Sequence, residues 1–452
     1  MKLTHFNYRD GGLRIENAAA ADLARRFGTP LYVYSRQSLR DAFSRVKGAF
    51  SEASTTVCYS VKSCGNLSIL KLLREAGAGF DIVSGGELYR VIKAGGDPRK
   101  IVFAGVAKSD DEIAKALEHD ILMLNVESEA ELDNIQAVAA SMGRVAPVAL
   151  RLNPDVDGKT HAKTTTGKKE NKFGIDLANA SRLVRNIAEQ PNIRLLGVDA
   201  HIGSPINDVV PYRQAMERIA AFIRDHRSPR AVLEYLNIGG GYGSLYRNER
   251  VPDFADYAAV IVPHVKATGC KLIVEPGRSI AANSAALLTR VLYVKDNGFK
   301  HFTIVDAGMN DLIRPAMYDS YHFCWPAEYD GIPPSPLFDS PGATGYFQRE
   351  EEEAGIVGNQ ALRNIDAEGL ILTDVVGPIC ESSDYFAKGR RIPVPERGNL
   401  MAVFSAGAYG FSMSSNYNAR PRPAEVLVEG DDARVIRERE RYEDLVAGES
   451  GS

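Results

Sequence analysis

Between Val57 and Gly277 the sequence alternates short apolar runs with amphipathic, helix-like stretches. Eight such runs follow one another: "VCYSVK", "FDIVS", "IVFAG", "ILMLNV", "PVALRLN", "LGVDAHIG", "YLNIGGG" and "LIVEPG". Helix patterns such as "NLSILKLLREAGA" and "SDDEIAKALEHD" lie between them, the second with Ser109 as its N-cap. Eight strand-then-helix units predict an α/β fold, a closed parallel (β/α)8 barrel of the TIM type.

The sequence pattern changes after about residue 280, where strand-like runs follow one another without helix-like stretches between them. These runs are "ALLTRVLYVKD", "HFTIVDAG", "ILTDVVGPIC", "MAVFSAGAYG" and "AEVLVEG". We therefore predict a barrel over 36–280 and a mostly β domain over 281–452. The N-terminal residues 1–35 contain "LYVYS", which either enters the barrel or joins the β domain. We favour the second arrangement and assign 1–35 to the β-rich domain.

Two segments interrupt this organisation. Residues 326–369 are rich in Pro and Gly and contain "QREEEEAG", which is typical of a surface insertion and a solvated loop. Its role is not indicated by the sequence. The basic stretch "KTHAKTTTGKKENKFG" follows the fifth strand, and we expect a flap over the barrel mouth rather than an RNA-binding patch.

Composition excludes several classes of protein. The 452 residues are 44% hydrophobic and 25% charged with a formal net charge of -4, which is unlike a dedicated nucleic-acid binder. The first residues lack the apolar core of a signal peptide and no run is long enough to span a bilayer, so we expect a cytoplasmic protein without membrane contact. The five cysteines are scattered and form no CxxC pair, which argues against a disulfide framework and a metal site.

Polar or reactive residues end several of the predicted strands, where barrel enzymes hold their chemistry. Lys62 ends the first strand, His201 the sixth, Gly239 to Gly241 the seventh and Glu275 the eighth. On a strand, Cys58, Ser60 and Lys62 share one face, which points inward in a barrel. Burial there lowers the pKa of an amine, and a neutral amine is the nucleophile that forms a Schiff base. The alternative is a lysine that snorkels at a strand end.

The glycines after the seventh strand predict a ligand for that amine. Barrels often bind phosphate with bare backbone N–H groups after strands seven and eight, although a tight turn also uses glycines. A phosphorylated aldehyde bound there would reach Lys62, which points to pyridoxal 5'-phosphate. Glu275 would then keep the ring nitrogen protonated, unless it only pairs with Arg278. His201 could lie flat on the ring, and Ser204 could bind the phosphate.

Several motifs, in this order, resemble the diaminopimelate decarboxylases, a family of fold-type III pyridoxal-phosphate enzymes with an alanine-racemase-like barrel and a β domain. They are "YSVKS", "FDIVSGGEL", "NKFGI", "HIGS", "NIGGGYG", "EPGRS", "DAGMNDLIRPAMY", "VVGPICESSDYFAK" and "GAYGFSMSSNYNARPRPAEVLV". The resemblance covers nearly the whole chain, and the last two motifs point to this family in particular. One departure is "KSC" in place of the expected "KAN", which puts Cys64 near the site without an assignable role.

The resemblance implies a role for individual residues. Catalysis would fall to Lys62, which carries the cofactor, and to Cys380, the general acid. The implied cofactor contacts are Lys62, Asp81, His201, Ser204, Gly240, Gly241, Glu275, Gly277, Arg278 and Tyr409. The implied substrate contacts are Arg278, Arg314, Tyr318, Glu381, Tyr409 and Tyr417.

The implied reaction is decarboxylation of meso-2,6-diaminopimelate to L-lysine and carbon dioxide, the last step of lysine biosynthesis. The substrate has an amino-acid head at each end and only one reacts, so the other must be recognised as a zwitterion. Arginine matches a carboxylate bidentately, and Glu381 can take an ammonium. Without the motifs, the arginines would read as surface ion pairs and Cys380 as a small buried apolar residue.

Two other functions stay open on the residues alone. One is a related decarboxylase of the ornithine, arginine or carboxynorspermidine type, against which "IRPAMY" and "CESSDY" argue. The other is a non-catalytic homologue, which retention of Lys62 and Cys380 disfavours. The resemblance further implies a homodimer in which the cysteine segment reaches the active site of the neighbouring subunit.

Overall fold

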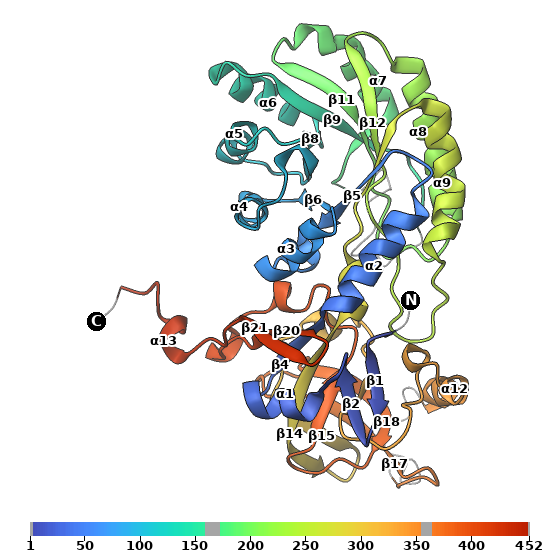
Figure 1. The fold of residues 1–452 in the computed structure, drawn as a ribbon, viewed down its shortest axis with the longest axis vertical. Coiled ribbons are helices and arrows are strands. Elements are labelled where there is room, and N and C mark those ends of the chain that lie inside the picture. The colour runs from blue at the N-terminus through green and yellow to red at the C-terminus, as the bar shows by residue number, and fades with distance from the viewer. Residues whose placement is uncertain (1–2, 159–171, 354–363, 451–452) are drawn as a thin grey trace. The chain divides into compact units, whose positions relative to one another are not determined.

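The structure, a computed structural model, describes residues 3–158, 172–353 and 364–450. The chain divides into two compact units (Figure 1). The barrel unit comprises Arg40–Gly243 and Val251–Ser279, and the β unit comprises Met1–Leu39, Ser244–Arg250 and Ile280–Ser452. The chain therefore passes between the units more than once, and each unit is built from separate segments.

Eight parallel strands close into a ring in the barrel unit, because β5 pairs with both β13 and β6 and β8 pairs with β9. The strands are β5 (Thr55–Ser60), β6 (Gly79–Ile82), β7 (Ile101–Phe103), β8 (Met123–Val126), β9 (Ala146–Asn153), β11 (Ile193–Asp199), β12 (Ala231–Asn237) and β13 (Lys271–Val274). The short β10 (Ile175–Asp176) pairs with β9 beside this ring. The predicted barrel is confirmed, with each strand in a run that the sequence pattern identified.

A helix follows each strand of the ring, as expected for this fold. The helices are α3 (Leu67–Glu75), α4 (Gly85–Lys93), α5 (Asp110–Glu118), α6 (Glu129–Ser141), α7 (Leu177–Asn186), α8 (Val210–His226), α9 (Phe254–Thr268) and α10 (Arg278–Ala281), and α2 (Arg36–Ala49) precedes β5. Ser109 caps α5 in a capping box with Glu112, as the sequence predicted. Apolar positions on these helices face the strands, which accounts for their amphipathic patterns.

The inside of the barrel is layered. An apolar cluster from five strands fills one level: Cys58, Val102, Met123, Ala149 and Ile273. Successive inward side chains on a strand are two residues apart, so the next level toward the carboxyl ends holds the polar residues Ser60, Asn125, Arg151 and Glu275. The apolar layer closes the barrel beneath a charged layer at its mouth.

The β unit contains the remaining strands. They are β1 (Phe6–Arg9), β2 (Gly12–Ile15), β3 (Ala18–Ala19), β4 (Leu31–Ser35), β14 (Ala285–Asp296), β15 (His301–Val305), β16 (Cys324–Pro326), β17 (Leu370–Val376), β18 (Tyr385–Pro393), β19 (Leu400–Val403), β20 (Ala424–Glu429) and β21 (Asp432–Arg437). The main sheet has the order β18-β17-β15-β14-β4-β20-β21, and β19 joins it through β14. Strand β4 is "LYVYS", and it pairs with β14 and β20.

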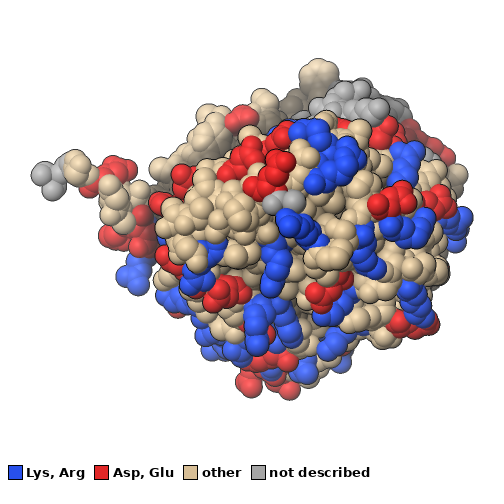
Figure 2. Space-filling model, turned by 90° about the horizontal axis from the view of Figure 1, so that it is seen from above, with Lys and Arg blue, Asp and Glu red and all other residues tan. Residues whose placement is uncertain are grey.

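The helices α1 (Ala20–Phe27), α11 (Arg314–Tyr318), α12 (Ala343–Glu353) and α13 (Tyr442–Leu445) complete the β unit. None of the helices in the described ranges is both long and apolar enough to cross a membrane. On the face drawn in Figure 2, lysine and arginine side chains are interspersed with aspartate and glutamate. This mixture agrees with a formal net charge of only -4.

The prediction that 326–369 forms a solvated loop is wrong for its described part. Helix α12 buries Tyr346 and Phe347, and Phe347 packs against Tyr321 with ring centroids 5.9 Å apart. The buried Glu350 of α12 forms an ion pair with Arg390 of β18 at 3.1 Å. The acidic run that looked like a solvated surface thus carries one face of a packed helix. Residues 354–363, and most of the expected flap at 159–171, lie outside the described residues.

We predict that Phe347→Ala lowers the free energy of unfolding by about 3–5 kcal/mol, because it empties a fully packed position in α12. The matched control is Gln348→Ala, one residue further on an exposed face of the same helix, which should change it by less than about 0.5 kcal/mol. Denaturant unfolding followed by circular dichroism measures both. Equal effects of the two substitutions would show that α12 does not pack as described.

Candidate active site

Lys62 lies just beyond the end of β5 and opposite Asp81 of β6. The strand register pairs Ser60 with Asp81. The Lys62 Nζ donates to Asp81 Oδ2 at 2.9 Å, and the Ser60 hydroxyl donates to the same oxygen. The Asp81 side chain is fully buried. This carboxylate therefore holds the amine at the carboxyl end of the barrel strands.

Two details of the Lys62 prediction are wrong. Strand β5 ends at Ser60, and Lys62 lies in the following 3-10 turn Val61–Ser63 rather than on the strand. Its side chain is 41% exposed, so burial does not desolvate the amine as expected. The ion pair with Asp81, and not enclosure by apolar residues, determines where the amine lies.

Buried carboxyl groups surround this position. Burial raises the pKa of Asp199, at the end of β11, to about 7. Burial also raises the pKa of Glu275 well above its ordinary value, and the charges of Asp81 and Asp199 raise it further. Arg151 offsets part of this charge through ion pairs with Glu127 and, at 3.7 Å, with Asp199. A site that crowds carboxyl groups in this way favours binding of a cationic group.

Two buried carboxylate oxygens in this cluster have no hydrogen-bond partner in the described part of the chain, Asp81 Oδ1 and Asp199 Oδ1. Glu275 is oriented by Asn237, whose Nδ2 donates to Glu275 Oε1 at 2.5 Å. Buried polar atoms without partners are rare in folded proteins and concentrate at functional sites. The cluster is therefore suited to a ligand rather than to stability alone.

The glycine run after β12 forms a tight backbone cradle. Gly239 and Gly241 have φ values of 65° and 103°, which side chains other than glycine rarely adopt. A Cβ on Gly240 would lie 2.2 Å from the carbonyl oxygen of Glu275. Tyr212 fixes the cradle, since its hydroxyl donates to the Gly240 carbonyl at 2.6 Å. Only glycine fits here, and the cradle is held from within, since the Gly239 N–H donates to Asn237 Oδ1 at 2.9 Å.

His201 follows β11 and contacts this cradle. Its Nδ1 accepts a hydrogen bond from the Gly240 N–H at 3.2 Å, so the neutral ring carries its proton on Nε2. Burial holds the pKa of His201 well below its ordinary value, and Arg151 and Lys62 add to this effect. A neutral, flat imidazole at the barrel mouth is suited to stacking on an aromatic ligand.

Arg278 and Ser204 complete the predicted set in the barrel unit. Arg278 begins α10, and its Nε donates to the Ser204 hydroxyl at 3.4 Å. Gly277 precedes it where a Cβ would lie 2.8 Å from Ser60 Cβ. The closeness of Gly277 to Ser60 brings the eighth strand end against the first, beside Lys62.

Cys380 and Glu381 lie together in a loop of the β unit between β17 and β18. Cys380 is exposed, whereas the other four cysteines are buried. Its main-chain N–H donates to Asn418 Oδ1 at 2.8 Å. Hydrogen bonds from Ser383 and Tyr417 hold the pKa of Glu381 below its ordinary value. The structure thus brings Cys380, Glu381 and Tyr417 into one cluster, with Glu381 ionised.

Asp384 shapes this loop. Its Oδ2 accepts from the Ile379 N–H and its Oδ1 from the Met309 N–H, each at 2.6 Å. One oxygen of this buried carboxylate therefore holds the backbone beside Cys380, and the other joins the loop to the segment of Met309. The next residue, Tyr385, donates to Asp319 Oδ1 at 3.0 Å and so joins the loop to the end of α11.

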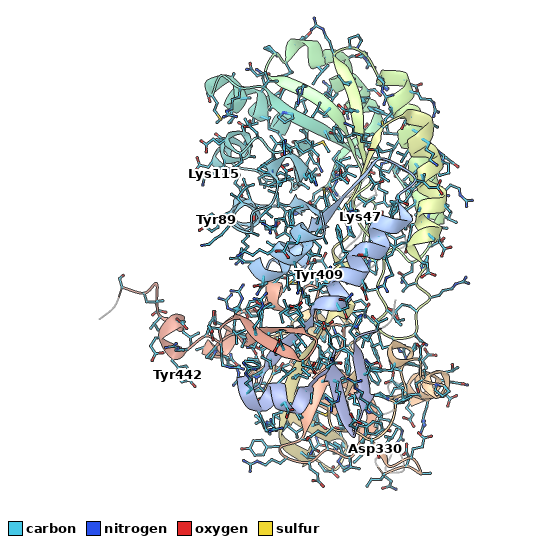
Figure 3. The ribbon with its side chains drawn as sticks, viewed as in Figure 1. Lys47, Tyr89, Lys115, Asp330, Tyr409 and Tyr442 are labelled. Atoms are coloured by element: carbon cyan, nitrogen blue, oxygen red, sulfur yellow. The ribbon has the colours of Figure 1, made fainter. Side chains whose placement is uncertain are left out.

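Helix α11 carries Arg314 and Tyr318. Arg314 is buried and Tyr318 is half-buried. Tyr409, labelled in Figure 3, has a φ of 57°, an uncommon value for a tyrosine. Several other residues that are not glycine share a positive φ, among them Asp10 and Asp120, so the role of Tyr409 stays a prediction.

Sequence reasoning missed four buried polar residues of the barrel mouth: Glu127, Arg151, Asp199 and Asn237. Strand periodicity could have identified two of them. Asp199 lies two residues before His201, and Arg151 lies two residues after the inward-facing Ala149, so both occupy the face that strand periodicity assigns to the interior.

Comparison with known proteins identifies the group to which this chain belongs. The profile of the pyridoxal-dependent decarboxylases, pyridoxal binding domain, matches residues 36–282. The diaminopimelate decarboxylase of Neisseria meningitidis serogroup A is 47% identical over 94% of this chain and 96% of that protein. The chain belongs to the diaminopimelate decarboxylase family. As a pyridoxal-dependent decarboxylase it uses pyridoxal 5'-phosphate.

Other members of the diaminopimelate decarboxylase family extend the likeness to the whole fold. The enzyme of Aquifex aeolicus is 43% identical over 98% of this chain and 96% of its own length. The crystal structure of diaminopimelate decarboxylase from Helicobacter pylori complexed with L-lysine superimposes with a TM-score of 0.83 at 38% identity, covering 94% of this chain and 98% of that one.

We predict that Gly240→Ala weakens binding of pyridoxal phosphate at least about tenfold, because the new Cβ would collide with the main-chain oxygen of Glu275, which cannot swing away. The matched control is Gly48→Ala in α2, where no atom lies within 4 Å of the new Cβ. Titration of cofactor-free protein, followed by visible absorbance, measures the affinity. Unchanged affinity for Gly240→Ala would exclude the cradle as the phosphate site.

Proposed function

We propose that this chain decarboxylates meso-2,6-diaminopimelate to L-lysine and carbon dioxide with pyridoxal 5'-phosphate, the last step of lysine biosynthesis. The observation that carries the proposal is that a chain 47% identical to a diaminopimelate decarboxylase contains two sets of residues. One set is the lysine, glycine cradle and carboxyl cluster of the barrel. The other is the arginine, glutamate and exposed cysteine of the β unit.

The barrel set fits the cofactor in charge and shape. The Gly239 and Gly240 N–H groups already donate to Asn237 and His201, so the Gly241 N–H is the cradle donor proposed for a phosphate, with Ser204, Gly277 and Arg278 completing the contacts. The orphaned Asp81 Oδ1 and the acidic cluster suit a cationic ring nitrogen. Glu275, oriented by Asn237, is the carboxyl group proposed to face that nitrogen.

Pyridoxal phosphate, when bound, supplies an electron sink for the electron pair left when a carboxylate departs. The residues of the chain do the rest. Lys62, held by Asp81, is the proposed point of covalent attachment, and the flat ring of His201 is proposed to stack on the cofactor. Tyr409 is proposed to close over it from the strained turn that follows β19.

Cys380 is the proposed general acid. Loss of carbon dioxide breaks the bond between the α-carbon and the carboxyl carbon, and the electron pair stays with the α-carbon. A proton from the Cys380 thiol then forms the new C–H bond, and solvent returns that proton to the thiolate. The exposed thiol can meet a substrate, unlike the four buried ones.

The second amino-acid head is the proposed basis of selectivity. Its carboxylate would bind Arg278 and Arg314, and its ammonium the ionised Glu381, with Tyr318, Tyr409 and Tyr417 as further contacts. A substrate with a plain amine tail lacks the carboxylate, so it would use only half of this receptor. The lysine/ornithine decarboxylase of Vibrio vulnificus is only 20% identical, a level at which the likeness extends to the fold alone.

Carbon dioxide release from meso-diaminopimelate, L-lysine, L-ornithine, L-arginine and carboxynorspermidine tests the proposal. We expect kcat/KM for meso-diaminopimelate at least about a hundredfold above the others, since each of these lacks the carboxylate of the second head. Faster turnover of L-lysine, L-ornithine, L-arginine or carboxynorspermidine would identify a related decarboxylase. Absence of any turnover by protein loaded with cofactor would favour the non-catalytic homologue.

We further propose a cytoplasmic homodimer with shared sites. The functional domains would be a cofactor-binding barrel over 36–280 and a β-rich domain formed by 1–35 and 281–452. Cys380 of the partner subunit would complete each site, which the exposure of the Cys380, Glu381 and Tyr417 cluster permits. Free cysteines suit a reducing compartment such as the cytoplasm.

Mixing inactive variants tests the shared site. Lys62→Ala and Cys380→Ala homodimers should each be nearly inactive, but a mixed dimer has one site with both substitutions and one with neither. Random reassortment makes half of the dimers mixed, so about a quarter of wild-type activity should return. Verified subunit exchange without recovered activity would show that Lys62 and Cys380 act within one chain.

A further inference from the structure

The guanidinium of Arg314 is held by three residues that no step above uses. Arg314 begins α11, and its residue is only 6% exposed. Its Nη1 lies 3.1 Å from His322 Nε2, and its Nη2 donates to the Ser320 hydroxyl at 3.2 Å. The guanidinium carbon lies 4.8 Å from the ring centroid of Tyr246. These contacts fix both the plane and the direction of the group.

The hydrogen bonds of His322 define its protonation. Its Nδ1 lies 2.9 Å from the carbonyl oxygen of Phe404, which can only accept, so Nδ1 carries a proton. The guanidinium of Arg314 can only donate, so Nε2 must accept from it. The fully buried His322 is thus a neutral ring in one tautomer, and its acceptor nitrogen points at Arg314.

Tyr246 locks the same arrangement from another segment. Its ring meets His322 edge to face, with centroids 5.5 Å apart and an angle of 84° between planes. Glu249 fixes the turn that carries it, because the N–H groups of Tyr246 and Arg247 each donate to that carboxylate at 2.9 Å. A cation over an aromatic face is stabilised electrostatically, and more so when it is desolvated.

The helix α12 anchors this turn in place. Arg247, the residue after Tyr246, forms ion pairs with Glu350 at 3.7 Å and with Glu351 at 3.4 Å. Both acids belong to the run "QREEEEAG" in the segment 326–369, whose role the sequence did not indicate. That segment therefore supports the residue on which Arg314 rests.

We propose that His322 and Tyr246 are positioning residues that orient the Arg314 guanidinium toward the carboxylate of the second amino-acid head. The inference rests on the proposed function, because it needs Arg314 to bind that carboxylate. A long arginine side chain loses rotamer freedom when it binds a ligand, and ordering it beforehand removes this cost from the binding step. The positioning pair thus contributes to selectivity without touching substrate.

Two substitutions at His322 separate positioning from structural support. The amide of His322→Asn can occupy the place of Nδ1 and donate to Phe404, but it lacks an atom at Nε2. The amide of His322→Gln can occupy the place of Nε2 and accept from Arg314, but it loses the bond to Phe404. Tyr246→Leu removes the ring from the other side, and Tyr246→Phe keeps it.

We expect His322→Asn and Tyr246→Leu to raise KM for meso-diaminopimelate about tenfold, with a smaller change in kcat, since a hydrogen bond or cation–aromatic contact to a charged group is lost. The inhibition constant of L-lysine, which keeps the second head, should rise in parallel. That of cadaverine, which has no carboxylate, should not. His322→Gln and Tyr246→Phe should stay within about threefold of wild type.

The outcomes separate this inference from the proposed function when Arg314→Gln is measured alongside. If Arg314→Gln raises KM and weakens L-lysine binding while His322→Asn and Tyr246→Leu do not, the positioning role is wrong and the proposed function stands. Equal losses in His322→Asn and His322→Gln would mean structural support only and overturn the inference. If Arg314→Gln has no effect, the assignment of Arg314 to the second head fails, and the inference with it.

Discussion

Hydrogen bonding between β8 and β9, and between β13 and β5, closes the barrel, and this closure sets the height of every inward-facing side chain. Because inward residues on a strand are two apart, Cys58 in the apolar layer is followed by Ser60 at the mouth, and Ile273 by Glu275. The register that pairs Ser60 with Asp81 then brings Lys62 within 2.9 Å of a buried carboxylate. A one-residue slip of one strand would turn these polar residues outward.

The buried carboxyl groups at the barrel mouth lower the stability of the protein alone and favour binding of a cationic ligand. Burying Asp81, Asp199 and Glu275 beside one another raises the pKa of Asp199 to about 7 and that of Glu275 well above its ordinary value. Such crowding opposes folding unless cations or hydrogen bonds offset it, and Arg151 offsets it only in part. A ligand that brings a positive charge relieves the repulsion, so the bound state is expected to be more stable than the protein alone.

In the β unit, hydrogen bonds hold polar side chains and the backbone beside them in fixed directions. Asp384 joins the backbone of the Cys380 loop to that of Met309 through its two carboxylate oxygens, while Asn418 holds the Cys380 N–H. His322 and Tyr246 hold the Arg314 guanidinium in the same way. In both cases a buried polar residue that bonds two neighbours restricts the position of a residue proposed to meet substrate.

The sequence by itself determined the barrel and the kind of site it carries. Strand runs of period two and helix runs of period 3.6 depend on neighbours along the chain, so "VCYSVK" to "LIVEPG" could be assigned to strands without the structure. The same runs placed Lys62, His201 and Glu275 at carboxyl ends of strands, where a parallel barrel collects its chemistry. The motifs then named the family, and comparison with relatives confirmed it.

Only the tertiary structure decided which residues meet across the chain. One face of helix α12 is buried because Phe347 packs against Tyr321 and Glu350 forms an ion pair with Arg390. The local sequence "QREEEEAG" cannot be distinguished from a solvated acidic run. The exposure of Lys62 depends on where β5 ends, and the tautomer of His322 depends on a carbonyl 82 residues away at Phe404. Burial and hydrogen-bond partners are properties of the folded arrangement, so periodicity and motif, which describe the chain one segment at a time, do not contain them.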